Sequence, residues 1–225
     1  MSGKTTPARP EPRLYLATPV VTDAAAFAAS LPAILGSADV AAVLVRLQDS
    51  DPRSMITTVK TLAPAIQGTG AALLIDGHPD IVARAGADGA HLTGVSVLED
   101  AMPGLKPNRI AGCGGLSTRH DSMRAGELGA DYVLFGERDA LGRRPSPDAV
   151  NERLAWWAEL FEPPCVGYAI SLKEAADFVA AGADFVLVDD LAWNDARGPA
   201  AALADIGATI RHAHAAAPVI AAGQS

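Results

Sequence analysis

The chain has 225 residues, 49% of them hydrophobic, and its 26 acidic against 18 basic residues give a formal net charge of -8. This length suits one large domain or two small ones and is ample for a sizeable core. The acidic balance argues against a nucleic-acid partner. The chain has no uninterrupted run of 18 apolar residues, so no membrane span is predicted. Two cysteines, Cys113 and Cys165, are too few for a disulfide framework, and residues 1–12 lack the apolar run of a secretory signal, so we expect a cytoplasmic protein.

Short apolar runs, typical of parallel strands buried on both faces, alternate along the chain with Ala-rich stretches of helical periodicity. Strands are expected at residues 13–18, 40–46, 71–75, 89–92, 109–113, 132–135, 165–169 and 185–188. Among the helices between them, residues 118–128 should turn Met123 and Leu128 inward. Eight such units without a break in composition predict a single (β/α)8 barrel over residues 13–216, and closure suits them better than the alternative, a doubly wound open sheet. Residues 1–12 and 217–225 are expected to be flexible tails.

A tetrapeptide ending in Gly-Ala-Asp precedes three of the expected strands, at residues 85–88, 128–131 and 181–184. A glycine at this place ends a helix in a left-handed conformation, and the short turn then leads into the next strand. The repeated tetrapeptide therefore indicates a recurring helix-to-strand connection.

In a barrel of this kind, the chemistry lies on the loops that follow the strands. Four candidate catalytic residues occupy such positions: Arg46, Asp76, His78 and His91. Arg46 either clamps an anionic substrate or pairs with Asp49. The two histidines suit acid–base catalysis, but they suit a structural hydrogen bond equally well.

A second set of residues at the same end of the barrel is typical of substrate binding. It consists of Gln48, Gly114, Gly115, Arg138, Arg143, Arg144, Asp189 and Asp190. The glycines either offer backbone N–H groups to a phosphate or form a tight turn. The three arginines form either a lid that grasps an anion or a solvated loop. We expect the two aspartates to cap the next helix or to pair with the lid, and we expect no metal site, because the acidic residues lie on different strands.

Three stretches resemble the thiamine phosphate synthase family. They are Leu-Ile-Asp-Gly-His-Pro-Asp-Ile at 74–81 with Ala-Asp-Gly-Ala-His-Leu at 87–92, Gly-Ala-Asp-Tyr-Val-Leu-Phe-Gly at 129–136, and residues 164–171 with 181–184. The resemblance runs from about Leu14 to Asp190 and implies the same (β/α)8 barrel. It also implies a transferase of thiamine biosynthesis that joins a pyrimidine methyl diphosphate to a thiazole phosphate and releases pyrophosphate with the help of Mg²⁺.

The chain departs from the family at the positions that hold metal and phosphate. Arg46 matches the family motif, but the two metal-binding aspartates fall on Gly77 and Ser96. The Gly-Gly phosphate cradle reads Ala169-Ile170, and Asp189-Asp190 replace the residues that follow the last strand. We therefore expect no bound Mg²⁺ and weak binding of thiamine phosphate.

Three functions are compatible with these residues. The first is a divergent transferase whose phosphate sites are rebuilt from Arg46 and the lid arginines. The second is a non-catalytic barrel that binds a small phosphorylated or heterocyclic ligand or a protein partner, as a monomer or a homo-oligomer. The third is a different barrel enzyme that uses His78 and His91.

Overall fold

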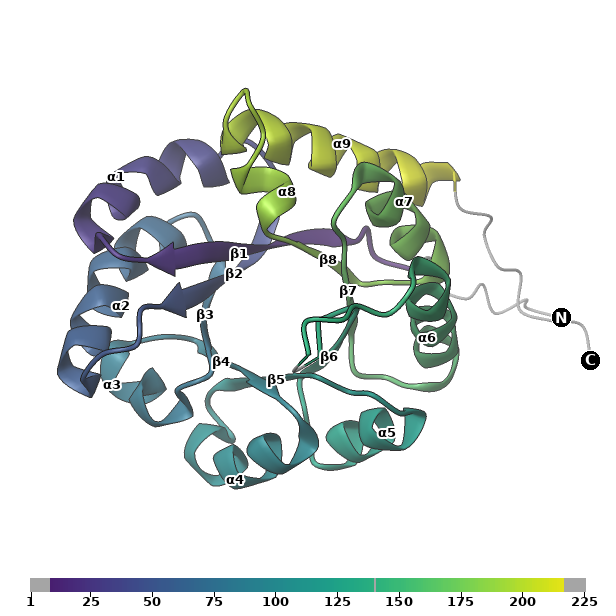
Figure 1. Ribbon diagram of the computed structural model, residues 1–225, viewed down its shortest axis with the longest axis horizontal. Coiled ribbons are helices and arrows are strands. Elements are labelled where there is room, and N and C mark those ends of the chain that lie inside the picture. Colours follow the sequence, from purple (N-terminus) through teal and green to yellow (C-terminus); the bar gives the residue numbers. More distant parts are fainter. Residues whose placement is uncertain (1–8, 140, 217–225) are drawn as a thin grey trace, which may run out of the picture.

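The computed structural model describes residues 9–139 and 141–216, and its strands form a closed parallel barrel in the order β1-β2-β3-β4-β5-β6-β7-β8, in which β1 also pairs with β8 (Figure 1). The strands are β1 (Arg13–Val21), β2 (Val40–Leu47), β3 (Ala72–Asp76), β4 (Gly89–Thr93), β5 (Ile110–Gly114), β6 (Tyr132–Phe135), β7 (Cys165–Tyr168) and β8 (Phe185–Val188). The (β/α)8 barrel predicted from the sequence is confirmed, and the open sheet is wrong.

Helices surround the barrel on its outside (Figure 1). They are α1 (Ala24–Leu35), α2 (Pro52–Gln67), η1 (Pro79–Ile81), α3 (Val82–Ala85), α4 (Val95–Leu105), α5 (Arg119–Glu127), α6 (Pro147–Leu160), α7 (Leu172–Ala181), α8 (Asp190–Trp193) and α9 (Pro199–Ala216). Several start at a side chain that accepts a hydrogen bond from the first turn, among them Thr118 of α5, Ser146 of α6 and Ser171 of α7. These caps fix the residue at which each loop after a strand ends and the next helix begins.

The apolar residues form two separate clusters. The larger one lies between strands and helices and includes Leu16, Ile75 and Trp157. The smaller one fills the inside of the barrel and includes Tyr15, Leu74, Tyr132, Leu134 and Leu187. The interior is therefore a packed core, as in other barrels of this class, and the chemistry must lie above it.

The repeated tetrapeptides form one structural device at the lower end of the barrel. Gly86, Gly129 and Gly182 have the left-handed backbone that the sequence predicts. Each following aspartate then uses its carboxylate to bind the preceding strand: Asp88 accepts the N–H of Leu73 at 2.7 Å, Asp131 that of Ala111 at 2.7 Å, and Asp184 that of Cys165 at 2.8 Å. The tetrapeptide thus ends a helix and also ties neighbouring strands together.

Helix α5 corrects one expectation. Met123 is 40% exposed, and the residues of α5 that face the core are the small Ser122 and Ala125. Leu128 is half-buried against the core. Of the predicted tails at 1–12 and 217–225, residues 1–8 and 217–225 lie outside the described residues, and Arg9 in the described part pairs with Asp184 at 2.9 Å. Within the described part no helix is long and apolar enough to cross a membrane.

Candidate functional site at the mouth of the barrel

A chain of hydrogen bonds leads from the barrel interior to its mouth. The hydroxyl of Tyr15 on β1 lies 2.9 Å from that of Tyr132 on β6, and the Tyr132 hydroxyl lies 2.9 Å from Nδ1 of His91 on β4. His91 Nε2 lies 3.1 Å from Oε1 of Glu137, which follows β6. The Oε2 atom of Glu137 accepts the N–H of Gly115 at 2.6 Å. His91 is only 1% exposed, so its hydrogen bonds are all to protein groups.

Two glycines of β5 make room for this chain. A Cβ atom on Gly112 would lie 2.0 Å from the Tyr132 ring. On Gly114 it would lie 1.8 Å from Oε2 of Glu137 and 2.7 Å from Nε2 of His91. These approaches are too close for any side chain, so Gly114 serves the His91–Glu137 pair. The Gly115 N–H, expected to be offered to a phosphate, is bound by a carboxylate instead.

The two members of the pair stabilise each other's charged forms. Burial alone would lower the pKa of His91, but the hydrogen bond and the negative charge of Glu137 outweigh it and raise that pKa. Burial alone would raise the pKa of Glu137, but the hydrogen bond and charge of His91 and the Gly115 N–H outweigh it and lower that pKa. The geometry therefore favours an imidazolium–carboxylate pair below the mouth.

Arg46 lies between two carboxylates at the other side of the mouth. Its Nη1 is 3.0 Å from Oδ2 of Asp189 at the end of β8, and its Nε is 3.5 Å from Oδ2 of Asp76 at the end of β3. Tyr168 of β7 donates its hydroxyl to the same Asp189 oxygen. Of the two alternatives for Arg46, the pairing with Asp49 is wrong, because the strand ends bring Asp76 and Asp189 closer, and the clamp on an anionic substrate stays a prediction.

Asp189 also corrects the expectation for the residues after β8. It precedes α8, but its side chain makes no capping bond to that helix. It binds Arg46 rather than Arg138, Arg143 or Arg144, and these three arginines have other partners: the Gly142 carbonyl, Asp139 and Glu174.

The three arginines of the loop after β6 serve different purposes. Arg144 has a side chain that is 9% exposed, and it binds Glu174 of α7 through two hydrogen bonds of 3.0 and 2.7 Å. It also donates to the Gly136 carbonyl at 3.0 Å and to that of Tyr168. Arg143 is exposed and pairs with Asp139, whereas Arg138 donates to the Gly142 carbonyl. Arg144 thus holds the loop on the barrel, and its charge is compensated.

Three sequence candidates stand apart from these clusters. Gln48 and Asp190 are exposed, and His78 is half-buried with a left-handed backbone at φ 48°. Within residues 9–139 and 141–216, no hydrogen bond or ion pair joins their side chains to Arg46, His91 or Glu137. Their roles stay predictions.

Sequence reasoning did not single out Tyr15, Tyr132, Glu137, Tyr168 or Glu174. A signal existed for the first two, because a tyrosine that points into a barrel must find a partner for its hydroxyl. No signal marked Glu137, since its role depends on how β4, β5 and β6 align across the sheet.

The described residues offer no donor set for Mg²⁺. No three His, Cys, Asp or Glu side chains among them gather closely enough to hold a metal ion. Gly77 has no side chain, Ser96 is exposed at the start of α4, and the guanidinium of Arg46 already occupies the place between Asp76 and Asp189. The ion that the family resemblance implies does not fit this mouth.

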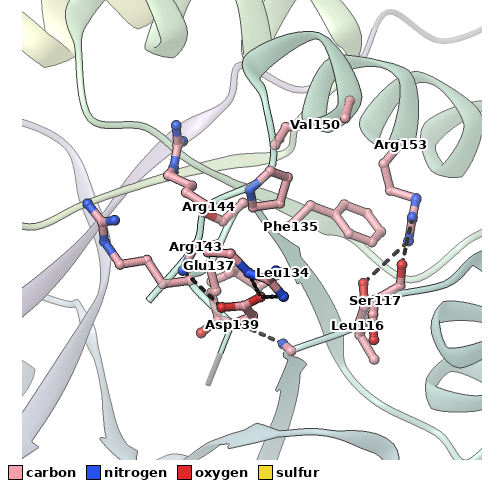
Figure 2. A pocket seen from close by; sticks show the side chains of 15 residues that line it. Leu116, Ser117, Leu134, Phe135, Glu137, Asp139, Arg143, Arg144, Val150 and Arg153 are labelled. Carbon is pink, nitrogen blue, oxygen red and sulfur yellow. Dashed lines mark hydrogen bonds and ion pairs between the residues drawn. The ribbon is translucent and has the colours of Figure 1, made fainter. Parts of the chain in front are cut away.

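A cavity of about 450 Å³ opens beside the axis of the barrel, between the loops after β5 and β6 and helix α6 (Figure 2). Its apolar surface comes from residues such as Leu116, Phe135 and Val150, and its polar residues include Glu137, Asp139 and four arginines: Arg138, Arg143, Arg144 and Arg153. Glu137 thus belongs both to this pocket and to the buried chain of hydrogen bonds.

Comparisons with known proteins agree with the fold and the sequence motifs. A profile of the family described as "Thiamine monophosphate synthase" matches residues 14–192. The chain is 39% identical over 207 residues to a "Thiamine-phosphate synthase" of Rhodospirillum centenum, covering 88% of this chain and 98% of that protein. It is 36% identical over 203 residues to one of Hyphomonas neptunium, covering 87% and 92%. A thiamine phosphate pyrophosphorylase structure from Pyrococcus furiosus superposes with a TM-score of 0.73 at 19% identity, over 90% of this chain and 97% of that one.

Proposed function

The chain belongs to the thiamine monophosphate synthase family, and we propose that it is a member that binds a small ligand without joining a pyrimidine methyl diphosphate to a thiazole phosphate. The protein acts in the cytoplasm, where its two buried cysteines stay free thiols. Its ligand is a small heterocyclic or phosphorylated molecule, and the acidic chain binds no nucleic acid.

One observation carries this proposal: the guanidinium of Arg46 is already bound by Asp76 and Asp189. One positive and two negative charges meet there, so a diphosphate would be repelled where it needs attraction. At about 4 Å and an effective dielectric near 20, one extra negative charge opposes one phosphate charge by about 4 kcal/mol. A Mg²⁺ ion would offset this repulsion, but Arg46 already binds Asp76 and Asp189, and among the described residues no third ligand side chain gathers with them.

The family's transfer reaction is the second candidate, because relatives as similar as 39% carry the name thiamine-phosphate synthase. Incubation of the purified protein with both phosphorylated substrates and Mg²⁺ distinguishes the transfer reaction from ligand binding without catalysis. We expect no thiamine phosphate above the level of a protein-free control. Formation of product that scales with protein and is lost in Arg46→Gln would overturn the proposal.

Binding is tested separately by thermal unfolding with the two unphosphorylated heterocycles, with each phosphorylated substrate and with thiamine phosphate. A ligand at one hundred times its Kd stabilises a protein by about 2.7 kcal/mol, so the midpoint should rise with one of the heterocycles or with the thiazole phosphate, whose ring carries a single phosphate. Thiamine phosphate should shift it least. A shift with none of these compounds would contradict the proposed choice of ligand.

A further inference from the structure

The pocket beside the barrel axis carries positive charge although the whole chain is acidic. Four arginines and two carboxylates line it, and positive charge remains after Glu174, which binds Arg144 from behind, is included. Figure 2 shows that the charges are unevenly placed: Arg143, Glu137 and Asp139 lie on one side, and Arg153 lies with Ser117 on the other. The Arg153 side therefore faces the pocket without a carboxylate.

Arg153 is held only by neutral acceptors. Its Nη1 lies 3.4 Å from the Leu116 carbonyl and 3.4 Å from the Ser122 hydroxyl, and its Nη2 lies 3.2 Å from the Ser117 carbonyl. Within the described part of the chain no carboxylate binds it. The adjacent Glu152 is bound by Arg119 at 2.7 Å. Burial and the nearby Arg119 lower the pKa of Arg153, against the smaller opposite effect of the charges on Glu152 and Asp121.

The apolar surface of the pocket lies directly beside this arginine. The guanidinium of Arg153 is 5.7 Å from the centre of the Phe135 ring, and Leu116, Pro145 and Val150 extend that surface. A volume of about 450 Å³ is within the range of roughly 300 to 1,000 Å³ that small-ligand sites have. A flat ring would pack on the exposed Pro145 and Ala149 while an attached anion reached Arg153.

We propose that this pocket binds a small organic anion, an apolar or aromatic ring that carries one carboxylate or phosphate, and that Arg153 receives the anion. The inference rests on the proposed function, since it names the ligand class and the place where that ligand binds. Carboxylate and phosphate both match the planar fork of an arginine, and bonds between two such charged groups are stronger than bonds between neutral groups by a factor of about two. The site lies outside the ring of strands, apart from Arg46.

Calorimetric titration at low salt with benzoate, phenyl phosphate and inorganic phosphate tests the proposal. We expect at least one aromatic anion to bind, and to bind more tightly than inorganic phosphate, because only the ring uses the apolar surface. Comparison of benzoate with phenyl phosphate tells which anionic group the pocket takes. Arg153→Gln should weaken the binding about tenfold or more, whereas Arg124→Gln, which removes a charge from the exposed face of α5, should leave it unchanged.

A second variant fills the pocket without touching the arginine. Ala149 is exposed and lines the entrance, so Ala149→Phe should block the aromatic anion while the protein stays folded. Absence of binding by both aromatic anions, or equal binding to wild type and to the folded Arg153→Gln and Ala149→Phe variants, would overturn the inference. The coupling assay is independent of this result, because product formation contradicts the proposed function whichever anion binds.

Discussion

His91 is an imidazole with 1% exposure whose charged form is stabilised by the carboxylate of Glu137 and, to a smaller extent, by that of Asp76. Because the folded protein raises the pKa of His91, this interaction stabilises the fold fully below pH 6.5, the ordinary histidine value, and the stabilisation is lost as pH rises through the raised pKa. Because the pKa of Glu137 is lowered, its contribution is present above about pH 4.3 and is lost as pH falls through the lowered value.

Replacement of Glu137 by Gln should therefore destabilise the protein mainly in mildly acidic solution. We expect a loss of about 1–3 kcal/mol near pH 5.5, typical of a buried bond to a charged group, and a smaller loss at pH 9. Urea unfolding at the two pH values measures the difference. His120→Gln, at an exposed position, serves as the control and should show no such dependence on pH.

Gly114→Ala should disrupt the His91–Glu137 pair sterically, since the added Cβ would push Glu137 and His91 apart. It should reproduce the pH dependence of Glu137→Gln. Gly104→Ala, which meets no atom within 4 Å, gives the matched control for adding a methyl group. If wild type and Glu137→Gln differ equally at both pH values, His91 is not charged in the fold.

The turns before β4, β6 and β8 share a carboxylate that binds the strand beside it. In Asp131→Ala the N–H of Ala111 loses its acceptor, and a buried donor without a partner costs about 1–3 kcal/mol. Hydrogen exchange at the Ala111 amide should therefore become faster. Asp100→Ala, at an exposed position on α4, should leave that amide protected. Unchanged protection in Asp131→Ala would show that the strand bond does not depend on this carboxylate.

The strands could be predicted because their signal is local. Runs such as 132–135 and 185–188 are apolar in consecutive residues, which is typical of a strand buried on both faces, and both were predicted with the observed bounds. Helix α5 was harder, since its core face consists of Ser122 and Ala125, and small residues add little to an apolar periodicity. Met123 was assigned inward for its apolarity and is exposed.

The mouth could be predicted only in part because its contacts join distant strands. Arg46, Asp76, His91 and Asp189 were found from their places at strand ends. Their partners were not: the Arg46–Asp189 contact spans 143 residues, and the His91–Glu137 contact spans 46. Such pairings follow from strand register and barrel closure, which side-chain type alone does not encode.

The molecule as a whole should respond little to divalent metal. Since the described residues hold no donor cluster, the unfolding midpoint should stay within about 1 °C after EDTA treatment and after addition of 5 mM Mg²⁺. Differential scanning calorimetry measures both. The informative control is Arg46→Gln, which leaves Asp76 and Asp189 without their shared cation, so this variant should be less stable than wild type and should gain stability from Mg²⁺. A rise of several degrees in wild type would show that metal binds the native protein.

The division of the apolar residues into an outer and an inner cluster has an evolutionary consequence. The outer cluster, between strands and helices, contains most of the buried residues and holds the scaffold together. The residues of the mouth lie at its edge, so mutations can exchange one set of charges for another there while selection on folding stays satisfied. A lineage can in this way retain the ancestral architecture, and much of the ancestral sequence, long after the ancestral substrate has been lost.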